Sequence, residues 1–430
     1  MLNVIEPVYY HNPLDFGYFS LLFFENGRTY QKSYKLVDLP EVIKSLRYDI
    51  DTYISQAEFK SFIRRLVNLL RVGLCFSDLD TYNSKYSDLS PRVQCEHLLS
   101  FCVKNRIPQP SLVLFSGRGL QAKWLFTKPI PYEALIRWNE VQRHLCDHLA
   151  DFGADLKARD ASRVLRLVHT VNTKTGEIVE VIYEHLYANG EIVRYDFDQF
   201  ADQVLPFTRA EYKERKKKII TRENINTEGL RVFSGQQLNF DRLTDLRTLA
   251  ALRHPEGIPE GKRDEFIFLA TGFMAWALDP LRLYDEIVHL AREFCPSLSI
   301  NEVRSYTSTV YRKAKEASRG KKIMFNGQWV DPRYRFRNQT LIDWLEIIPY
   351  EERHLKTIIS DAEAGRRHRC SERERYRTEH IGAVDRQTYL GRAEQRREDA
   401  CRLKDYGLNV QEIAEYLRVS RMQVYNYLKM

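Results

Sequence analysis

The chain contains an aspartate pair, Asp78-Leu79-Asp80, at the end of an apolar run that starts at Val72. If this run is a strand, alternation puts both carboxylates on one face and turns Leu79 into the core. Two like charges on one face repel unless a cation lies between them. Oxygen ligands of this kind suit Mg²⁺ or Mn²⁺, so the pair predicts a two-metal site for phosphoryl or nucleotidyl transfer. The competing interpretation is a strand that ends in a polar turn, because Thr-Tyr-Asn-Ser follows Asp80.

A second cluster, Ser116-Gly117-Arg118-Gly119, lies between two apolar runs that predict a hairpin over 111–127. Glycines on both sides of Arg118 let backbone amides and a guanidinium approach a phosphate together. An ordinary hairpin with an exposed arginine is the alternative.

A third cluster, over residues 152–174, mixes carboxylates with hydrogen-bond donors. So many donors beside carboxylates suit a triphosphate or a nucleic-acid backbone, and a solvated surface segment is the alternative. Its members are Asp155, Asp160, Arg163, Arg166, His169, Asn172 and Lys174.

Composition bounds the functions that these clusters can serve. The 430 residues are 43% hydrophobic, which is enough for two to four folded domains. The net charge of +8 favours a polyanionic partner. The seven cysteines form no Cys-x-x-Cys pair, so neither a zinc site nor a disulfide framework is expected. No leader or membrane-spanning run is apparent, and we expect a cytoplasmic protein without a membrane partner.

The elements that must position the clusters follow from periodicity and turn residues. The sequence predicts two strands around a Glu-Asn-Gly turn at 25–27 and helices over 55–71, 91–104 and 132–150. Strands over 177–184 and 191–196 flank Asn189-Gly190, a typical hairpin turn.

The second half is helical by pattern. Helices over 241–253, 263–278, 281–294 and 299–317 predict a bundle, with Ser299 or Asn301 as a cap, and a charged helical stretch covers 340–403. The last thirty residues fit a helix-turn-helix whose first short helix covers 409–417, with a capping residue ahead of it. Its expected DNA-reading residues are Ser420, Arg421, Gln423 and Tyr425, and a helical hairpin without a DNA role is the alternative.

Taken together, the three clusters resemble the motifs of the archaeo-eukaryotic primase superfamily, in particular the primases and primase-polymerases of plasmids and mobile elements. The resemblance covers about residues 55–205 and rests on Asp78-Leu79-Asp80, on the Ser-Gly-Arg-Gly-Leu-Gln hairpin at 116–121 and on 153–174.

The resemblance implies an α+β fold: a primase-like mixed-sheet catalytic domain, then an all-α helical bundle and a C-terminal helix-turn-helix. Expected boundaries are 1–210 for the catalytic domain, 211–235 for a linker, 236–320 for the bundle, 321–400 for a charged helical segment and 401–430 for the helix-turn-helix.

It also implies roles for individual residues. Asp78, Asp80 and Asp155 would be the catalytic carboxylates and ligands of two Mg²⁺ or Mn²⁺ ions, with Asp160 as the alternative third ligand. Nucleoside triphosphates would be the substrates. Their expected binding residues are Ser116, Gly117, Arg118, Gly119, Gln121, Arg163, Arg166, His169, Asn172 and Lys174.

Two departures from the family pattern stand out. Gln121 occupies the apparent position of a histidine that contacts nucleotide phosphates, and glutamine carries no charge. Leu167-Val168-His169-Thr170 lacks the family's Pro-Gly turn.

The leading hypothesis is a DNA-dependent primase that copies a single-stranded DNA template, with duplex origin DNA as a further partner. Any replicative helicase must be a separate protein, because the chain has no Walker-type motif. One alternative is a non-catalytic DNA-binding replication initiator or regulator. Another is a glycosyltransferase that uses Asp-x-Asp, which the basic C-terminal half disfavours.

Overall fold

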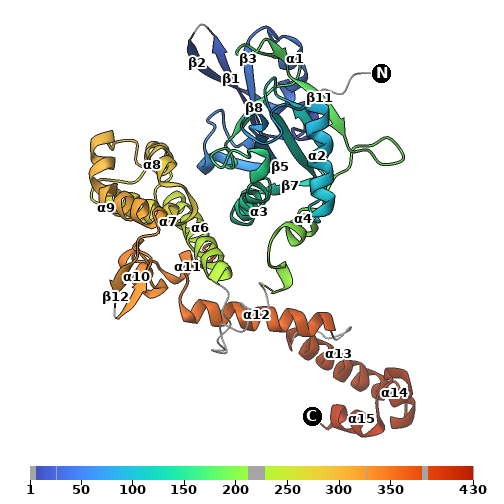
Figure 1. The fold of residues 1–430 in the computed structure, drawn as a ribbon. Helices are drawn as coiled ribbons and strands as arrows, with labels where there is room; N and C mark the ends of the chain where they lie inside the picture. The colour runs from blue at the N-terminus through green and yellow to red at the C-terminus, as the bar shows by residue number, and fades with distance from the viewer. Residues whose placement is uncertain (1–5, 26, 212–227, 326, 380–385, 430) are drawn as a thin grey trace. The chain divides into compact units, whose positions relative to one another are not determined.

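The computed structural model describes residues 6–25, 27–211, 228–325, 327–379 and 386–429. The chain divides into two compact units, one comprising residues 1–337 and 354–358, the other residues 338–353 and 359–430. The first unit contains a large sheet and a set of helices, and the second is helical (Figure 1). Among the described helices, none is long and apolar enough to span a bilayer.

A nine-stranded sheet forms the core of the first unit, in the order β11-β6-β7-β5-β4-β1-β3-β8, with β2 paired to β1. The strands are β1 Tyr18–Glu25, β2 Arg28–Lys35, β3 Asp51–Ser55, β4 Glu58–Phe59, β5 Leu69–Leu79, β6 Leu112–Phe115, β7 Leu120–Pro131, β8 Val164–Arg166 and β11 Glu180–Glu184. The helices around them are α1 Leu39–Lys44, α2 Pro91–Lys104, α3 Leu135–His148 and α4 Phe197–Val204. A short pair, β9 Val171–Asn172 with β10 Glu177–Ile178, stands apart from the sheet.

The expectation of a mixed sheet is wrong for the paired strands. All pairs between the described strands are antiparallel. After the connection through α2, strand β6 does run parallel to β5. However, β7 returns through a tight hairpin and lies between them, so β5 and β6 never become neighbours.

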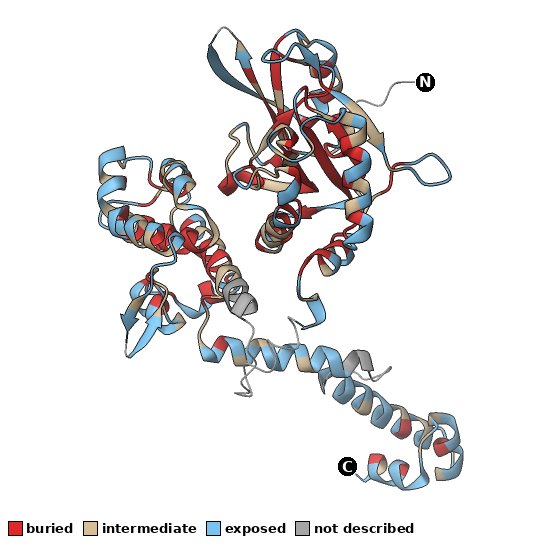
Figure 2. Ribbon diagram, viewed as in Figure 1, coloured by how far each residue is buried: buried red, intermediate tan, exposed pale blue. Residues whose placement is uncertain are grey.

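The central strands are buried on both faces, which fixes the position of the aspartate pair. Eight of the eleven residues of β5 and the first seven residues of β7 are buried (Figure 2). Helix α3 is tied to β5 because the Trp138 indole donates to the Leu74 carbonyl at 2.9 Å. Gln142 adds a pair of hydrogen bonds to the backbone of Phe76.

Two local predictions are wrong. Residues 55–71 form β4, an irregular loop, a short 3₁₀ turn and the start of β5 instead of a helix. The apolar residues that suggested a helix do not share a face, since Phe59 is buried in the sheet and Phe62 is 65% exposed. After the Asn189-Gly190 turn, residues 191–196 make isolated bridges instead of a strand.

Four longer helices complete most of the first unit; three agree closely with the predicted ranges, whereas the first begins well before the predicted start at residue 241. They are α6 Glu228–Arg253, α7 Arg263–Ala277, α8 Pro280–Phe294 and α9 Ile300–Ser318. Ser299 caps α9 with a capping box. The hairpin of β12 Ile323–Phe325 and β13 Gln328–Val330 follows. Of the expected linker over 211–235, residues 212–227 lie outside the described residues, and residues 228–235 belong to α6 instead.

The second unit contains α10 Asn338–Trp344, α11 Pro349–Glu352, α12 Asp361–Glu379, α13 Arg386–Asp405, α14 Val410–Leu417 and α15 Arg421–Leu428. The expected charged stretch is therefore divided among several helices, and α12 and α13 are mostly exposed (Figure 2). A small core of Ala400, Ile413, Ala414, Val424 and Tyr427 joins α13, α14 and α15.

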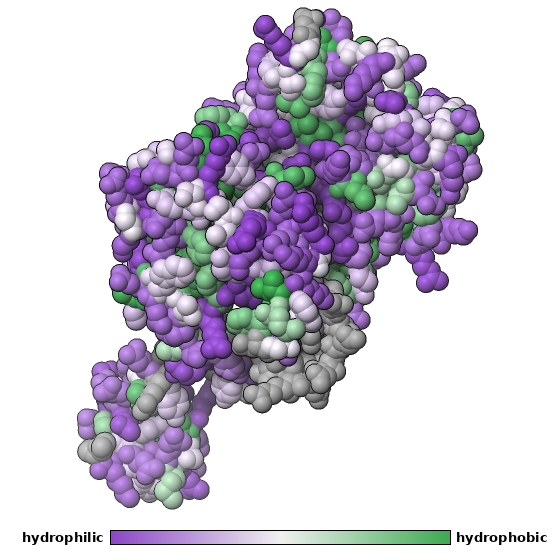
Figure 3. Space-filling model, turned by 60° about the vertical axis from the view of Figure 1, so that its left-hand side comes forward, coloured by the Kyte–Doolittle hydropathy of each residue, from purple (hydrophilic) through white to green (hydrophobic). Residues whose placement is uncertain are grey.

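The face drawn in Figure 3 is mostly hydrophilic, with hydrophobic residues in small separate patches.

Candidate active site

Strand β5 places the aspartate pair at the edge of the buried core. Asp78 lies within the strand, Asp80 directly follows it, and the intervening Leu79 is buried, as alternation predicts. The strand is long and apolar because both faces of the central sheet are covered. The strand therefore places two partly buried carboxylates at the edge of the core.

The segment Gly153-Ala154-Asp155 brings a third carboxylate to the same face. Ala154 bridges Leu79 in antiparallel register. The Asp155 amide donates to the Asp78 carbonyl and the Asp80 amide donates to the Gly153 carbonyl, both at 2.9 Å. Asp155 is thus the cross-strand neighbour of Asp78, and glycine stands opposite Asp80.

Gly153 is required by this close approach. Its φ is +76°, and a Cβ there would lie 2.6 Å from the Asp80 carbonyl oxygen. On the other side of the strand end, a Cβ on Gly119 would lie 2.3 Å from the Leu79 carbonyl oxygen. Two glycines therefore allow two loops to pack against the backbone that carries the aspartates.

The electrostatics of the three carboxylates reflect this crowding. Burial raises the pKa of Asp78 to about 6, and the charges of Asp80 and Asp155 add to the shift while Arg163 opposes it. Arg163 forms an ion pair with Asp155 at 3.1 Å. The face therefore carries more negative charge than its own cations neutralise, an arrangement that a bound cation relieves.

The donor set suits a hard divalent cation in chemical type, since all three ligands are carboxylate oxygens. Within the described part of the chain, however, no group of three or more acidic, histidine or cysteine side chains is arranged to hold a metal. The Asp155 carboxylate is instead engaged by the Arg163 guanidinium at 3.1 Å and by the Lys157 backbone amide at 2.8 Å. Binding would require Asp155 to exchange that partner.

Asp160, the alternative third ligand, has a different role. Its carboxylate accepts hydrogen bonds from the Ser162 amide and hydroxyl and is ion-paired to Arg282 of α8. It is not among the charges that act most on Asp78. Asp160 therefore joins the sheet to the helices.

The hairpin turn at Ser116–Gly119 is held in place by the third cluster. The side-chain amide of Asn172 donates to the Ser116 carbonyl at 3.1 Å, and the Thr175 hydroxyl donates to the Gly117 carbonyl at 2.8 Å. Gly117 has a φ of +82°, and a Cβ there would meet Asn172 at 2.6 Å. Asn172 is buried, so it positions this turn.

Arg118 is linked to the aspartates through a residue that sequence reasoning missed. Its guanidinium lies 3.6 Å from the centre of the Tyr82 ring. Burial raises the pKa of Tyr82, and the interaction of its hydroxyl with the Asp80 carboxylate adds to the shift. Arg118 and Asp80 thus both lie beside Tyr82.

Gln121 lies directly opposite Asp78 in the pairing of β7 with β5. It is 2% exposed, and among the described residues its Oε1 has no hydrogen-bond partner. An unsatisfied buried acceptor is costly, so this oxygen is available to a ligand or water at the site.

Arg166 is a buried residue of the sheet and not an open phosphate site. It is ion-paired to Asp51 and donates to the Asn172 side chain at 3.1 Å. It also lies over Tyr53, with 4.7 Å between guanidinium and ring centre. Burial raises the pKa of Tyr53, and the Asp78 carboxylate is among the charges that add to the shift. Tyr53 therefore borders the site, although its sequence context gave no signal of this.

His169 and Lys174 remain exposed. His169 has a φ of +69°, and the Thr170 hydroxyl donates to the Leu167 carbonyl at 2.6 Å. A histidine in left-handed conformation thus makes the turn at this point of the chain. Lys174 lines a cavity of about 640 Å³ together with Arg47, Tyr53 and Asp51.

In the second unit, α14 and α15 form a helical pair with a short turn between them. Asn409 caps α14, so the helix begins one residue later than the predicted start at Asn409. Ser420 caps α15 by accepting from the Gln423 amide, so its side chain serves the helix start. Arg421, Gln423 and Tyr425 are exposed on α15.

Comparison with known proteins gives one relative by sequence. No family model matches the chain. Over 337 residues it is 28% identical to a replication protein of Clostridium perfringens, which covers 77% of this chain and 73% of that protein. A match of this length extends beyond the sheet into the helical part of the chain.

Two solved structures also align. The primase-polymerase domain of cyanophage S-2L is 18% identical, with a TM-score of 0.32 over 44% of this chain and 91% of that one. Primase RepB′ is 13% identical, with a TM-score of 0.29 over 72% of this chain and 96% of that one. By sequence, the chain is similar to a replication protein.

Proposed function

We propose that this chain is a DNA-dependent primase, able to extend its own products, that serves the replication of a plasmid or mobile element. The observation that carries the proposal is the carboxylate face formed by Asp78, Asp80 and Asp155, with Gln121 and Arg118 beside it. The similarity to a replication protein supports the same conclusion.

In this proposal, Asp78, Asp80 and Asp155 hold two Mg²⁺ or Mn²⁺ ions. When bound, such ions lower the pKa of an attacking hydroxyl and neutralise the charge of departing pyrophosphate. The chain's own residues bind and orient the nucleotide. Arg118, on its rigid turn, reaches the phosphates, and the free Oε1 of Gln121 accepts a hydrogen bond from the nucleotide or from water.

The alternative is a non-catalytic DNA-binding initiator or regulator. The ion pair between Arg163 and Asp155 favours it, because it neutralises a carboxylate without a metal. In either case, the exposed Arg421, Gln423 and Tyr425 of α15 are proposed to read duplex DNA as part of a helix-turn-helix.

Incorporation of labelled nucleotides on single-stranded DNA, without primer and with Mg²⁺ or Mn²⁺, tests the proposal. We expect short products from the wild type and at least a hundredfold less from Asp78→Asn, because one removed ligand weakens the metal site. Asp88→Asn, at an exposed position, is the matched control. Separate ribonucleotide and deoxyribonucleotide pools identify the substrate.

Duplex binding is measured in parallel and should be unchanged in Asp78→Asn. Products from Asp78→Asn at the wild-type level would refute the site. No products from any protein, together with specific duplex binding, would support the initiator instead.

A further inference from the structure

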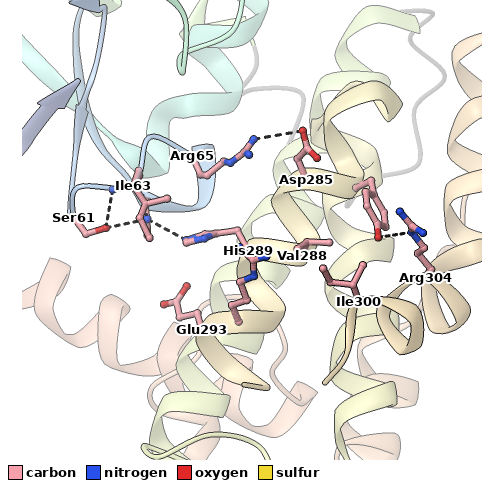
Figure 4. Close-up of a pocket in the computed structure, with 12 residues that line it drawn as sticks. Ser61, Ile63, Arg65, Asp285, Val288, His289, Glu293, Ile300 and Arg304 are labelled. Atoms are coloured by element: carbon pink, nitrogen blue, oxygen red, sulfur yellow. Dashed lines mark hydrogen bonds and ion pairs between the residues drawn. The ribbon is translucent and has the colours of Figure 1, made fainter. Parts of the chain in front are cut away.

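Two cavities in the first unit join into one groove beside the carboxylate face. The first, of about 540 Å³, is lined by Arg163, the partner of Asp155, and by Arg282 of α8. The second, of about 850 Å³, lies between the loop at 61–68 and helices α8 and α9 (Figure 4). The cavities share Ile63, Arg65 and Asp285, so they are continuous.

Arginine is the dominant charge of this groove. The lining arginines are Arg64, Arg65, Arg163, Arg282, Arg292 and Arg304, and the lining carboxylates are Asp285, Glu286 and Glu293. Arg163 and Arg282 are ion-paired to Asp155 and Asp160, and the remaining four arginines still outnumber the lining carboxylates. A concave surface of one charge sign attracts ions of the opposite sign.

Arg64 is a partly buried cation of this groove. Its guanidinium donates to neutral acceptors, the Gln31 side chain at 2.8 Å and the Ser162 carbonyl. Within the described ranges, no carboxylate lies at ion-pair distance from it. Burial lowers the pKa of Arg64, and the charges of Arg65, Arg282 and Arg163 lower it further, while Asp160 opposes the shift. A partly buried cation among like charges is costly, and a bound anion offsets that cost.

The nearby carboxylates are already engaged elsewhere. Glu286 accepts hydrogen bonds from the Leu66 and Val67 amides, both at 3.1 Å. Glu293 pairs with Arg247, outside the groove, at 3.4 Å. Asp285 reaches Arg65 only at 3.6 Å, with both side chains largely exposed, so this pair is weak.

The far end of the groove adds an aromatic surface. Arg304 donates to the Tyr284 hydroxyl at 2.7 Å and lies 5.3 Å from the centre of its ring (Figure 4). Arg292 and Arg304 are exposed, and in the described part of the chain neither forms an ion pair. Cations beside an aromatic ring are typical of surfaces that bind unpaired nucleotides.

We propose that this groove binds the phosphodiester backbone of a single nucleic-acid strand and leads it toward the carboxylate face. A strand fits better than a free nucleotide because the cations are spread along two cavities, whereas a triphosphate requires them to converge. The charge argument is independent of catalysis, but the identification of the strand as template rests on the proposed function.

The test is the affinity of the full chain for a labelled single-stranded oligonucleotide, measured by fluorescence anisotropy at several salt concentrations without divalent ions or nucleotides. The groove variant reverses three charges, at the half-buried Arg65 and the exposed Arg292 and Arg304: Arg65→Glu, Arg292→Glu and Arg304→Glu. The matched control, Arg92→Glu, Lys104→Glu and Lys128→Glu, makes the same charge change at exposed positions outside both cavities.

We expect the groove variant to lose affinity by about 10- to 100-fold and the slope of log affinity against log salt to decrease in magnitude by about 2, at ~0.7 per lost phosphate contact. The control and the affinity for duplex DNA should stay near wild type. Equal losses in the groove variant and the control would refute the groove. So would an equal loss on duplex DNA, or full displacement of the strand by excess nucleoside triphosphate.

Because this assay needs no synthesis, its outcome is separable from that of the proposed function. If the protein makes no products but its strand binding is lost in the groove variant, the groove proposal is supported and the primase proposal is refuted. If the protein makes products but the groove variant binds the strand normally, the primase proposal is supported and the groove proposal is refuted.

Discussion

At the scale of single residues, the site is built from groups whose ordinary chemistry is disturbed by their neighbours. Asp78 is partly buried among like charges, and Gln121 has a buried oxygen without a partner among the described residues. Such features reduce stability in the absence of a ligand, and they are common where function requires them.

The pKa of Asp78 predicts a pH-dependent stability. Burial raises this pKa to about 6, so the folded protein holds the proton more tightly than the unfolded chain. The contribution of Asp78 to the free energy of unfolding therefore falls as the pH rises from about 4, the ordinary pKa of an aspartate, to about 6. We expect Asp78→Asn to be about 1–3 kcal/mol more stable than wild type at pH 7.5, with a smaller difference near pH 4.5.

Urea unfolding at both pH values measures this difference, and Asp88→Asn should show none. A difference that is the same at both pH values would show that Asp78 has an ordinary pKa in the folded protein. Added Mn²⁺ should narrow the gap between wild type and Asp78→Asn by stabilising the wild type alone.

At the scale of elements, the site depends on loops that approach a strand end closely. Gly153 and Gly119 permit this approach, and the segment through Asp155 acts as a short extra strand beside β5. Backbone geometry therefore determines which carboxylate becomes the third member of the face.

Gly153→Ala tests this role, with Gly176→Ala as the matched control. Both glycines have φ near +77°, but nothing lies within 4 Å of a Cβ on Gly176. The control should lose about 1 kcal/mol for the left-handed conformation alone. Gly153→Ala should lose about 1–3 kcal/mol more and most nucleotide incorporation, because the added carbon pushes Asp155 away from Asp78. Equal losses by denaturant unfolding would show that the close approach is unimportant.

At the scale of the whole molecule, specific contacts join the sheet to the helices of the first unit. Glu286 of α8 accepts from two backbone amides of the loop before β5, and Arg282 pairs with Asp160. The Tyr132 and Phe240 rings pack 4.6 Å apart, which adds an apolar contact. The sheet and these helices should therefore unfold together.

Glu286→Ala should uncouple them. Removing the carboxylate leaves the Leu66 and Val67 amides without their partner, at a cost of about 2–4 kcal/mol. We expect calorimetry to show one thermal unfolding transition of the first unit in the wild type and two in Glu286→Ala, one for the sheet and one for the helices. Asp285→Ala, at the neighbouring exposed position, should leave one transition. A single transition in Glu286→Ala would mean that the apolar contacts alone couple the two parts.

The sequence by itself determined the local features. The apolar run before Asp78 defines a buried strand, the glycines around Arg118 define a tight turn, and the spacing of apolar residues defines α2, α3 and α7 to α9. These follow from neighbours in the chain, so pattern alone reveals them. The predicted helix over 55–71 was wrong because its apolar spacing serves the sheet through β4 and β5.

Only the tertiary structure decided how distant segments meet. It placed Asp155 beside Asp78 through a bridge between segments far apart in sequence, engaged Asp160 with Arg282, and buried Arg166 against Asp51. It also gathered Arg64, Arg163 and Arg282 along one groove. A charged residue looks the same in sequence whether it faces a partner or a cavity, and burial and pairing, which decide its chemistry, are set by residues remote along the chain.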